Sequence, residues 1–359
     1  MRQSIQTICR RLASAGVALA AVFGGPAAAQ ETINLTAVSG YSPVVTWTRE
    51  FRAFFIPEVN KRLASKYKIN WNEAYGGQIA NPGGELQAIQ RGLADIGIVV
   101  IPFHTDKIGL YAINFYTPFV VHDVVVAQKA VDRMVKQFPA MAKQWEPLNQ
   151  VFLASFGVVD DYQIVVRKPV KAMDDFKGLK IGGSGANILW LQAMGATGVQ
   201  TNLAEAYNNI KSGVMDGMII HTGGARNVKL FEVAPYHVNA NLGAVTSFTV
   251  NVNAATWKRL PADVRTTLQE VAAAYAEHTA IAGRADTKLG LEAYKEANGT
   301  FVDVSDATRR AWAKNMPNIA KRWAEDHDKQ GLPGTQVLAA YMDAMRAEKQ
   351  PVLRNWDKE

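Results

Sequence analysis

The sequence predicts a two-lobed α/β protein, with hinge strands between the lobes and one long helix that braces them. Short β-rich runs alternate with amphipathic or alanine-rich helical stretches, which is typical of α/β folds. Two strands of the second half end at glycine-rich turns before helices, at the sheet edge where α/β proteins usually bind ligands. A helical pattern over residues 262–298 is longer than one small lobe needs.

The 359 residues are 48% hydrophobic and 20% charged, which is enough to bury one large core or two smaller ones. Three basic residues lie near the start, and from Gln30 onward 36 basic residues face 32 acidic ones, a net charge of +4. No basic cluster accompanies this mild surplus. We therefore expect no nucleic acid among the partners.

The N-terminus predicts a cleavable signal peptide. A basic start that ends in Arg10 and Arg11 precedes an apolar run, and small residues at 27–29 suit a signal peptidase. The alternative, a membrane anchor, needs about 20 apolar residues, whereas glycines and a proline at 24–26 interrupt this run. We expect cleavage after Ala29 by the ordinary export route, and hence an exported protein.

The mature chain contains no thiol, because the single cysteine, Cys9, falls within the leader. An exported protein without disulfides is held together by core packing. No later segment reaches membrane-spanning length, so we expect the mature chain to be soluble.

Strands and helices alternate in both halves of the mature chain. In the first half, strands are predicted at residues 33–38, 68–73 and 96–101, and helices at 46–63 and 84–92. In the second half, strands are predicted at 151–155, 163–166, 179–181 and 217–220, and helices at 186–194 and 203–212. Glycine turns follow two of these strands, at 182–185 and 222–224.

Pro261 begins the long helix, which at ~1.5 Å per residue is roughly 50 Å long and is expected to brace both lobes. A strand at 301–304 and helices at 306–328 and 335–349 complete the chain. No linker or repeat separates the lobes, so crossing strands near 158–162 and 241–248 are expected to act as hinges. The predicted division is a signal peptide at 1–29, a first lobe of residues 30–159 plus 246–285, and a second lobe of residues 160–245 plus 286–359.

Motifs of common enzyme classes are absent. The chain has no P-loop, no Gly-x-Ser-x-Gly and no His-Glu-x-x-His motif, and no cysteine nucleophile remains after export. Only one of the six histidines, His327, lies among carboxylates, at 325–328, and we interpret that cluster as a solvated helix face rather than a metal site. We expect no catalytic residue, no metal and no cofactor.

The turn formed by Gly182, Gly183, Ser184 and Gly185 is a candidate anion site. Glycines let a ligand approach the backbone, and the following helix, with Asn187 in its first turn, offers unpaired N–H groups. A tight strand-to-helix turn without a ligand explains the same residues equally well. The turn at 222–224 carries the same ambiguity, with His221 before it and Arg226, more often a surface residue than a clamp, after it.

Aromatic residues near predicted strand ends form a second candidate set. Any one of them is more often core than pocket, but several at one edge would form the apolar walls of a small-molecule site. The set is Tyr41, Trp47, Tyr75, Phe103, Tyr116, Tyr162 and Phe248. We interpret Trp190, within an Ile-Leu-Trp-Leu stretch, as a core residue.

Several segments, spread over almost the whole mature chain, form an ordered series. They are GGQI (76–79), ELQAIQRGLADI (85–96), YTPF (116–119), MDDFKGLKI (173–181), GVMDG (213–217) and ATWKRLP (255–261). Together they resemble the DctP-type solute-binding proteins of TRAP (tripartite ATP-independent periplasmic) transporters. The resemblance implies a periplasmic-binding-protein-like fold whose lobes close on a ligand. It also implies delivery to a permease with a small and a large membrane subunit, driven by an ion gradient.

The chain departs from that family at the residues that hold the substrate. The resemblance places the arginine that pairs with the substrate carboxylate at Gly182 and a second common arginine at Tyr162, and its further polar residue falls among Met218, Ile219 and Ile220. An arginine fork matches a carboxylate geometrically, and glycine supplies no such contact. Arg167 is the nearest arginine, and we do not expect it to replace the clamp.

We therefore expect a solute receptor without catalysis, which binds a small organic solute, by family resemblance an organic anion. An ABC-type receptor and, less favoured, a secreted enzyme on the same scaffold are the alternatives. The predicted substrate-binding residues are Tyr41, Tyr75, Phe103, Tyr162, Gly182, Gly183, Ser184, Asn187, His221 and Phe248.

Overall fold

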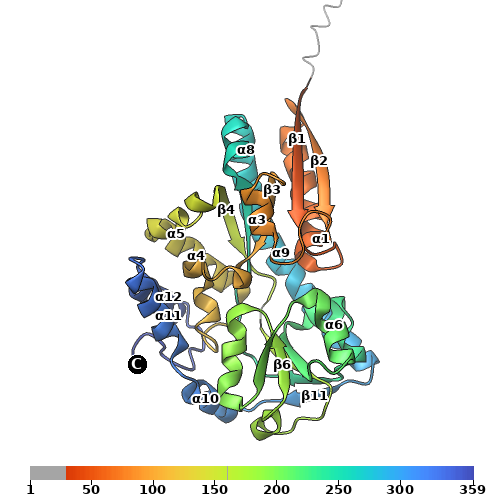
Figure 1. Ribbon diagram of the computed structural model, residues 1–359, viewed down its shortest axis with the longest axis vertical. Helices are drawn as coiled ribbons and strands as arrows, with labels where there is room; N and C mark the ends of the chain where they lie inside the picture. The colour runs from red at the N-terminus through yellow and green to blue at the C-terminus, as the bar shows by residue number, and fades with distance from the viewer. Residues whose placement is uncertain (1–29, 160) are drawn as a thin grey trace, which may run out of the picture.

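Two mixed sheets with surrounding helices make up the molecule. The computed structural model describes residues 30–159 and 161–359, so the predicted signal peptide lies outside the described residues. In Figure 1 the strands β1 to β4 occupy the upper half of the molecule, and β6 and β11 lie in the lower half. This arrangement confirms the predicted two-lobed α/β fold class.

The first sheet has the strand order β2-β1-β3-β10-β4. Its strands are β1 (Glu31–Ser39), β2 (Tyr67–Tyr75), β3 (Ile96–Val100), β4 (Gln150–Phe156) and β10 (Phe248–Asn253). Strands β1, β2 and β3 are parallel, and β10 is antiparallel to both β3 and β4. The carboxyl ends of the three parallel strands therefore meet at one edge, which also contains the first residue of β10.

The second sheet has the order β11-β9-β5-β8-β6-β7. Its strands are β5 (Gln163–Val166), β6 (Lys180–Gly183), β7 (Thr197–Gln200), β8 (Gly217–Ile220), β9 (Tyr236–Asn239) and β11 (Thr300–Asp303). Strands β6, β7 and β8 are parallel, and β5 runs antiparallel to β8, so that Gln163 lies opposite Ile220. The start of β5 and the ends of β6 and β8 share one edge.

Helices surround and join the sheets. The α-helices are α1 (Thr46–Glu50), α2 (Ile56–Leu63), α3 (Glu85–Gln90), α4 (Val124–Gln137), α5 (Pro139–Lys143), α6 (Leu203–Lys211), α7 (Thr222–Asn227), α8 (Ala254–Arg259), α9 (Ala262–Glu296), α10 (Asp306–Asn315), α11 (Ile319–Lys329) and α12 (Gly334–Ala347). The 3-10 helices are η2 (Ile101–Phe103), η3 (Gly109–Phe115), η4 (Glu146–Leu148), η5 (Met173–Phe176), η6 (Gly185–Met194) and η7 (Leu230–Glu232), and η1 (Phe51–Phe55) is a π-helix between α1 and α2. No helix within residues 30–159 and 161–359 is long and apolar enough to cross a membrane.

Three segments connect the two sheets. The crossing segments, residues 157–162 and 240–247, join β4 to β5 and β9 to β10. Their described residues lie side by side in antiparallel orientation. Val159 is bridged to Val245, the Tyr162 N–H donates to the Gly243 carbonyl at 3.1 Å, and the Leu242 N–H donates to the Tyr162 carbonyl at 3.0 Å. They coincide with the predicted hinge strands, and hinge motion about them stays a prediction.

Helix α9 is the third connection and confirms the predicted long helix to within two residues at its C-terminal end. It follows Pro261, whose fixed φ suits a helix start. It packs on α1, α2 and β4 of the upper half of the molecule and on α7 of the lower half. A helix of 35 residues therefore contacts both halves, as a bracing element requires.

Four predicted elements differ from the structure. The predicted helix 306–328 is two helices, α10 and α11, because Pro317 stops the first one. Strand β6 continues through the first two glycines of the predicted turn and ends at Gly183. The segment 186–194 lies within the 3-10 helix η6, and 222–224 is the first turn of α7 rather than a free loop.

The C-terminal helices contact elements that we assigned to the other lobe. Helix α12 packs on α4 and η3, and α11 packs on η3 (Figure 1). The tail continues this contact, since the Trp356 indole N–H donates to the Pro118 carbonyl at 3.0 Å and the Leu353 N–H to the Phe119 carbonyl at 3.0 Å. The assignment of residues 286–359 to the second lobe stays a prediction.

Candidate ligand-binding site

The predicted aromatic residues of the first sheet gather at its shared edge. Tyr41 follows β1, Tyr75 ends β2, Phe103 follows β3 and Phe248 begins β10. The register places Ser39 opposite Tyr75 and Val100 opposite Phe248. Phe103 is half-buried, and the other three are at most 7% exposed.

The second sheet contributes His221 and Tyr162 from neighbouring strands. His221 follows β8 and Tyr162 precedes β5, which pairs with β8. The two rings are 6.3 Å apart at 89°, and the Tyr162 ring also packs edge-on against Trp190 at 5.6 Å. Trp190 is buried, as predicted, and its indole N–H donates to the Phe115 carbonyl at 2.7 Å.

Trp47, from helix α1, links Tyr41 to Phe248. Its ring lies 5.0 Å from Tyr41 and 4.5 Å from Phe248, which in turn stacks on Phe156 at 5.2 Å. We define the aromatic cluster as Tyr41, Trp47, Tyr162, His221 and Phe248. Trp47 belonged to the wider aromatic set but not to the predicted binding residues. Only its contact with Phe248, distant in sequence, reveals its place.

Two buried polar atoms in or next to the cluster have no hydrogen-bond partner among the described residues. They are Trp47 Nε1 and the Ser247 hydroxyl, from side chains that are each 3% exposed. Burial raises the pKa of Tyr162 to about 12, and its interaction with the Ser247 hydroxyl opposes that rise. An unpaired buried polar group costs about 1–3 kcal/mol, so such groups in native proteins usually have a partner.

His221 is a neutral hydrogen-bond donor. Its Nδ1 accepts from the Gly224 N–H at 3.0 Å and caps helix α7, which leaves the ring proton on Nε2. Burial lowers its pKa to about 4, so that the ring is uncharged at neutral pH. The histidine therefore contributes an N–H group and no positive charge.

The glycine turn uses its donors within the chain. The Ser184 N–H donates to Asn187 Oδ1 at 2.8 Å and the Ser184 hydroxyl to the Thr201 carbonyl at 3.0 Å. A Cβ on Gly182 would lie 2.5 Å from Met215 Sδ, and one on Gly185 would lie 2.1 Å from the Pro102 carbonyl. Binding of an anion by Ser184 stays a prediction, and it requires these contacts to rearrange.

Gly183 is equally confined, because a Cβ there would lie 2.4 Å from Asn187 Oδ1. Asn187 itself is 1% exposed. The glycines of this turn therefore serve close packing of β6 and η6 against their neighbours in the structure as it stands.

No lysine or arginine is buried in the described part of the chain. Its buried ionisable groups, besides tyrosines, are Glu85, Asp286 and four histidines. Arg167 is exposed, and Arg226 is half-buried on α7. A carboxylate bound within the aromatic cluster would meet neutral donors rather than a guanidinium.

Glu85, which sequence reasoning did not single out, holds two loops at the edge of the first sheet. Its carboxylate accepts the N–H groups of Gly40 at 3.0 Å and Gly83 at 2.7 Å. Burial raises its pKa to about 7, although these N–H groups act in the opposite direction. Gly40 precedes Tyr41, and the Phe103 ring packs beside Gly83, so Glu85 sets the backbone next to two predicted site residues.

The acidic cluster around His327 does not converge. The His327 Nδ1 lies 2.7 Å from the Trp323 carbonyl and its side chain is buried, so the interpretation of a solvated face was wrong for this residue. Asp328 accepts from the Thr335 N–H at 3.1 Å. Within the described residues, no group of three or more histidine, cysteine or acidic side chains is placed to hold a metal ion.

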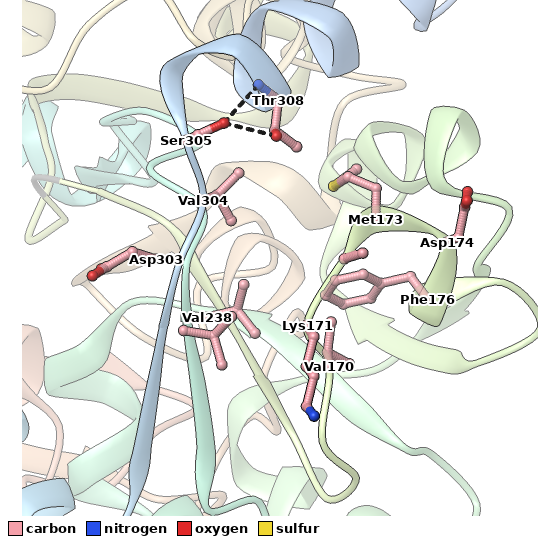
Figure 2. Close-up of a pocket in the computed structure, with 12 residues that line it drawn as sticks. Val170, Lys171, Met173, Asp174, Phe176, Val238, Asp303, Val304, Ser305 and Thr308 are labelled. Carbon is pink, nitrogen blue, oxygen red and sulfur yellow. Dashed lines mark hydrogen bonds between the residues drawn. The ribbon is translucent and has the colours of Figure 1, made fainter.

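A separate pocket of about 470 Å³ lies against β9 and β11 (Figure 2). Apolar side chains, among them Phe176, Val238 and Val302, form its wall. Ser305 on its rim is within 2.9 Å of the Thr308 hydroxyl, and none of the predicted site residues lines it. This pocket is distinct from the aromatic cluster.

A family profile matches most of the chain. The DctP profile, described as bacterial extracellular solute-binding protein, family 7, covers residues 42–326. Among curated proteins, the chain is 29% identical over 160 residues to the C4-dicarboxylate-binding periplasmic protein DctP of Rhodobacter capsulatus, and 26% identical over 220 residues to its namesake from Vibrio cholerae. The Rhodobacter match covers 44% of this chain and 48% of that relative, and the Vibrio match covers 59% and 63%. The chain therefore spans less than two thirds of the length of either relative.

Solved structures share the fold. An extracytoplasmic solute receptor from Bordetella pertussis that binds pyroglutamic acid superimposes with a TM-score of 0.74 at 19% identity, over 86% of this chain and 99% of that chain. A TRAP solute-binding protein from Rhodoferax ferrireducens in complex with copurified benzoate superimposes with a TM-score of 0.77 at 17% identity, over 88% and 98%. One from Desulfovibrio salexigens with bound orotic acid has a TM-score of 0.75 at 18% identity, over 88% and 99%.

Proposed function

This chain belongs to the DctP family, the bacterial extracellular solute-binding proteins of family 7, and from that premise we propose that it is the periplasmic receptor of a TRAP transporter. It captures a small organic acid and delivers it to the small and large membrane subunits of a permease. The receptor acts without catalysis. It reaches the periplasm after cleavage of the predicted signal peptide behind Ala29.

The aromatic cluster carries this proposal. Its members come from strand ends of both sheets and from α1, and Tyr162 lies in a crossing segment. Trp47 Nε1, and the hydroxyl of Ser247 directly before Phe248, are buried without a hydrogen-bond partner among the described residues. Apolar walls with a few convergent polar groups are what a small-molecule site offers. Tyr41, Tyr162 and Phe248 form the walls, and Trp47, Ser247 and His221 supply donors.

The remaining predicted residues frame this cluster. Tyr75 and Phe103 extend the aromatic wall along the first sheet. The turn of Gly182, Gly183 and Ser184, with Asn187, borders the site from the second sheet and donates to the ligand once its internal hydrogen bonds are exchanged.

The ligand is a small organic acid held by neutral donors. Relatives of this fold bind pyroglutamic acid, benzoate or orotic acid. A hydrogen bond to a charged group contributes about 1.5–3 kcal/mol, so two or three neutral donors suffice to replace one arginine fork. The absence of a buried arginine or lysine in the described residues predicts that binding depends on shape and hydrogen bonds rather than on ion pairing.

A thermal-shift screen tests this function. We expect at least one of pyroglutamate, benzoate, orotate and glucuronate to stabilise the mature protein, and its neutral amide analogue to stabilise it less. Because no buried cation pairs with the acid, its Kd should change less than about threefold between about 50 and about 500 mM NaCl. Analysis of the compound that copurifies with the protein identifies the ligand independently.

Four outcomes would contradict parts of the proposal. Stabilisation by neutral or cationic compounds alone would refute the organic acid. Turnover of a stabilising compound would favour a secreted enzyme, and dependence of uptake on a neighbouring ATPase would favour an ABC-type receptor. A steep loss of affinity with salt would point to an ion pair that forms only in the complex.

Ligand binding is expected to close the two halves of the molecule about the crossing segments. Small-angle scattering of the mature protein, with and without saturating amounts of the acid that gives the largest thermal shift, should show a smaller radius of gyration with ligand. Hinge closure acts through a few residues at element ends, as at residues 157–162 and 240–247. An unchanged radius of gyration at saturation would contradict this prediction.

A further inference from the structure

One face of helix α9 touches Val158, in the first crossing segment, and helix α7. A Cβ on Gly283 would lie 2.3 Å from the Val158 carbonyl, and one on Gly290 would lie 2.6 Å from the Thr222 carbonyl. Between these glycines, Asp286 packs against Gly223, where a Cβ would lie 3.0 Å from the Asp286 Cβ. Positions i, i+3 and i+7 share one helix face, so the three residues form a single contact surface.

The same helix holds α1 at two points. The Tyr275 hydroxyl donates to the Trp47 carbonyl at 2.6 Å. About three turns further along, Asp286 Oδ2 accepts from the Thr46 hydroxyl at 2.6 Å and from Arg49 Nη2 at 2.9 Å. Asp286 is 4% exposed, whereas the Arg49 side chain is 36% exposed.

The contacts of α1 and α7 with α9 therefore meet at Asp286, and each of these two helices adjoins the aromatic cluster. Helix α1 carries Trp47, whose ring packs on Phe248. Helix α7 is capped by His221, which faces Tyr162. We propose that Asp286 is a positioning residue for the binding site: its carboxylate fixes α1 on α9 at the point where α9 packs on α7, and so sets the spacing between Trp47 and His221.

The hydrogen bonds show why this role falls on Asp286 rather than on its arginine partner. Arg49 Nε also donates to Glu50 at 2.7 Å, so the guanidinium keeps a partner when Asp286 is removed. Thr46 is fully buried, and its hydroxyl has no other acceptor among the hydrogen bonds of the described residues. Loss of the carboxylate therefore frees the first residue of α1, directly beside Trp47.

Hydrogen exchange followed by mass spectrometry tests the role without any ligand. In Asp286→Ala, amides of residues 46–50 should exchange about tenfold faster, because α1 loses its hydrogen bonds to α9. Residues 222–227 should exchange at an unchanged rate, because alanine keeps the Cβ and the backbone that pack on Gly223. In Thr46→Val, which removes only the hydroxyl, residues 46–50 alone should exchange faster. Thr46→Ser, which keeps the hydroxyl, and Lys288→Ala, on the exposed face of α9, should match the unchanged protein.

The pattern separates positioning from general destabilisation. The proposal would be overturned if, in both Asp286→Ala and Thr46→Val, amide exchange in β3 and β8 accelerated as much as in residues 46–50. It would also be overturned if the exchange of residues 46–50 stayed unchanged in both variants. If Asp286→Ala fails to fold, Thr46→Val with its Thr46→Ser rescue still decides.

The effect of the positioning role of Asp286 on ligand binding rests on the proposed function. Calorimetric titration with benzoate and with pyroglutamate should show an affinity about tenfold lower in Thr46→Val than in Thr46→Ser. Equal affinities in these two variants would overturn the positioning role. If neither acid binds the unchanged protein, the proposed ligand class fails, and the exchange pattern alone decides on Asp286.

Discussion

Replacing Tyr162 by alanine is expected to weaken ligand binding by about tenfold or more, which is about 1.4 kcal/mol. The Tyr162 ring packs edge-on against His221 and Trp190, and its hydroxyl lies near the unpartnered Ser247 hydroxyl. The substitution therefore removes both the ring, which forms an apolar wall of the proposed site, and the hydroxyl beside Ser247. Calorimetry with the best acid of the thermal-shift screen measures the effect.

Two further variants separate the ring from its surroundings. Tyr162→Phe keeps the ring, so its affinity should fall less than that of Tyr162→Ala. Tyr207→Ala, on helix α6, removes a tyrosine whose hydroxyl contacts Glu232 outside the cluster, and should bind normally. Normal affinity in a folded Tyr162→Ala protein would make Tyr162 a core residue only.

The Gly283→Val variant is expected to lower the free energy of unfolding by about 3 kcal/mol, the upper end of typical overpacking costs. The new Cβ would lie 2.3 Å from the Val158 carbonyl, a backbone atom that cannot rotate away as a flexible side chain can. Helix propensity alone predicts the opposite sign, since valine is a few tenths of a kcal/mol better than glycine inside a helix. Urea denaturation followed by circular dichroism gives the sign directly.

Ala285→Val is the matched control for that variant. Ala285 lies on the exposed face of α9, two positions from Gly283, so only propensity acts on it. We expect a loss of less than about 1 kcal/mol there. Stability equal to that of the unchanged protein in Gly283→Val would show that α9 shifts freely against the crossing segment.

Much of the candidate site was predictable because strand ends are local features. The pattern of β-rich runs placed Tyr41, Tyr75 and Phe248 at strand ends, and parallel pairing then brings such ends to one edge. His221 was singled out by the glycines that follow it. The neutral charge state of His221 could not be predicted from the sequence, because burial inside the fold is what lowers its pKa.

The rest of the site depends on partners far apart in the chain. Trp47 meets Phe248, and Thr46 meets Asp286 at a separation of 240 positions. The Ser184 hydroxyl donates its hydrogen bond to the Thr201 carbonyl, 17 positions away, and this partner cannot be read from the local sequence. No local pattern indicates which side chain fills the space beside a glycine, so the Met215 contact at Gly182 was unforeseen.

By itself, the sequence determined the α/β class, the long helix from Ala262 and the positions of most strands along the chain. These features follow from hydrophobic periodicity, from proline and glycine, and from residue identity, all of which act over a few neighbouring positions. Only the tertiary structure decided that Trp47 and Ser247 hold unpartnered polar atoms, that Ser184 already uses its donors, and that α9 meets α1 and α7 at Asp286. Hydrogen bonds and burial of this kind arise between distant segments, and their energies exist only once the chain has packed.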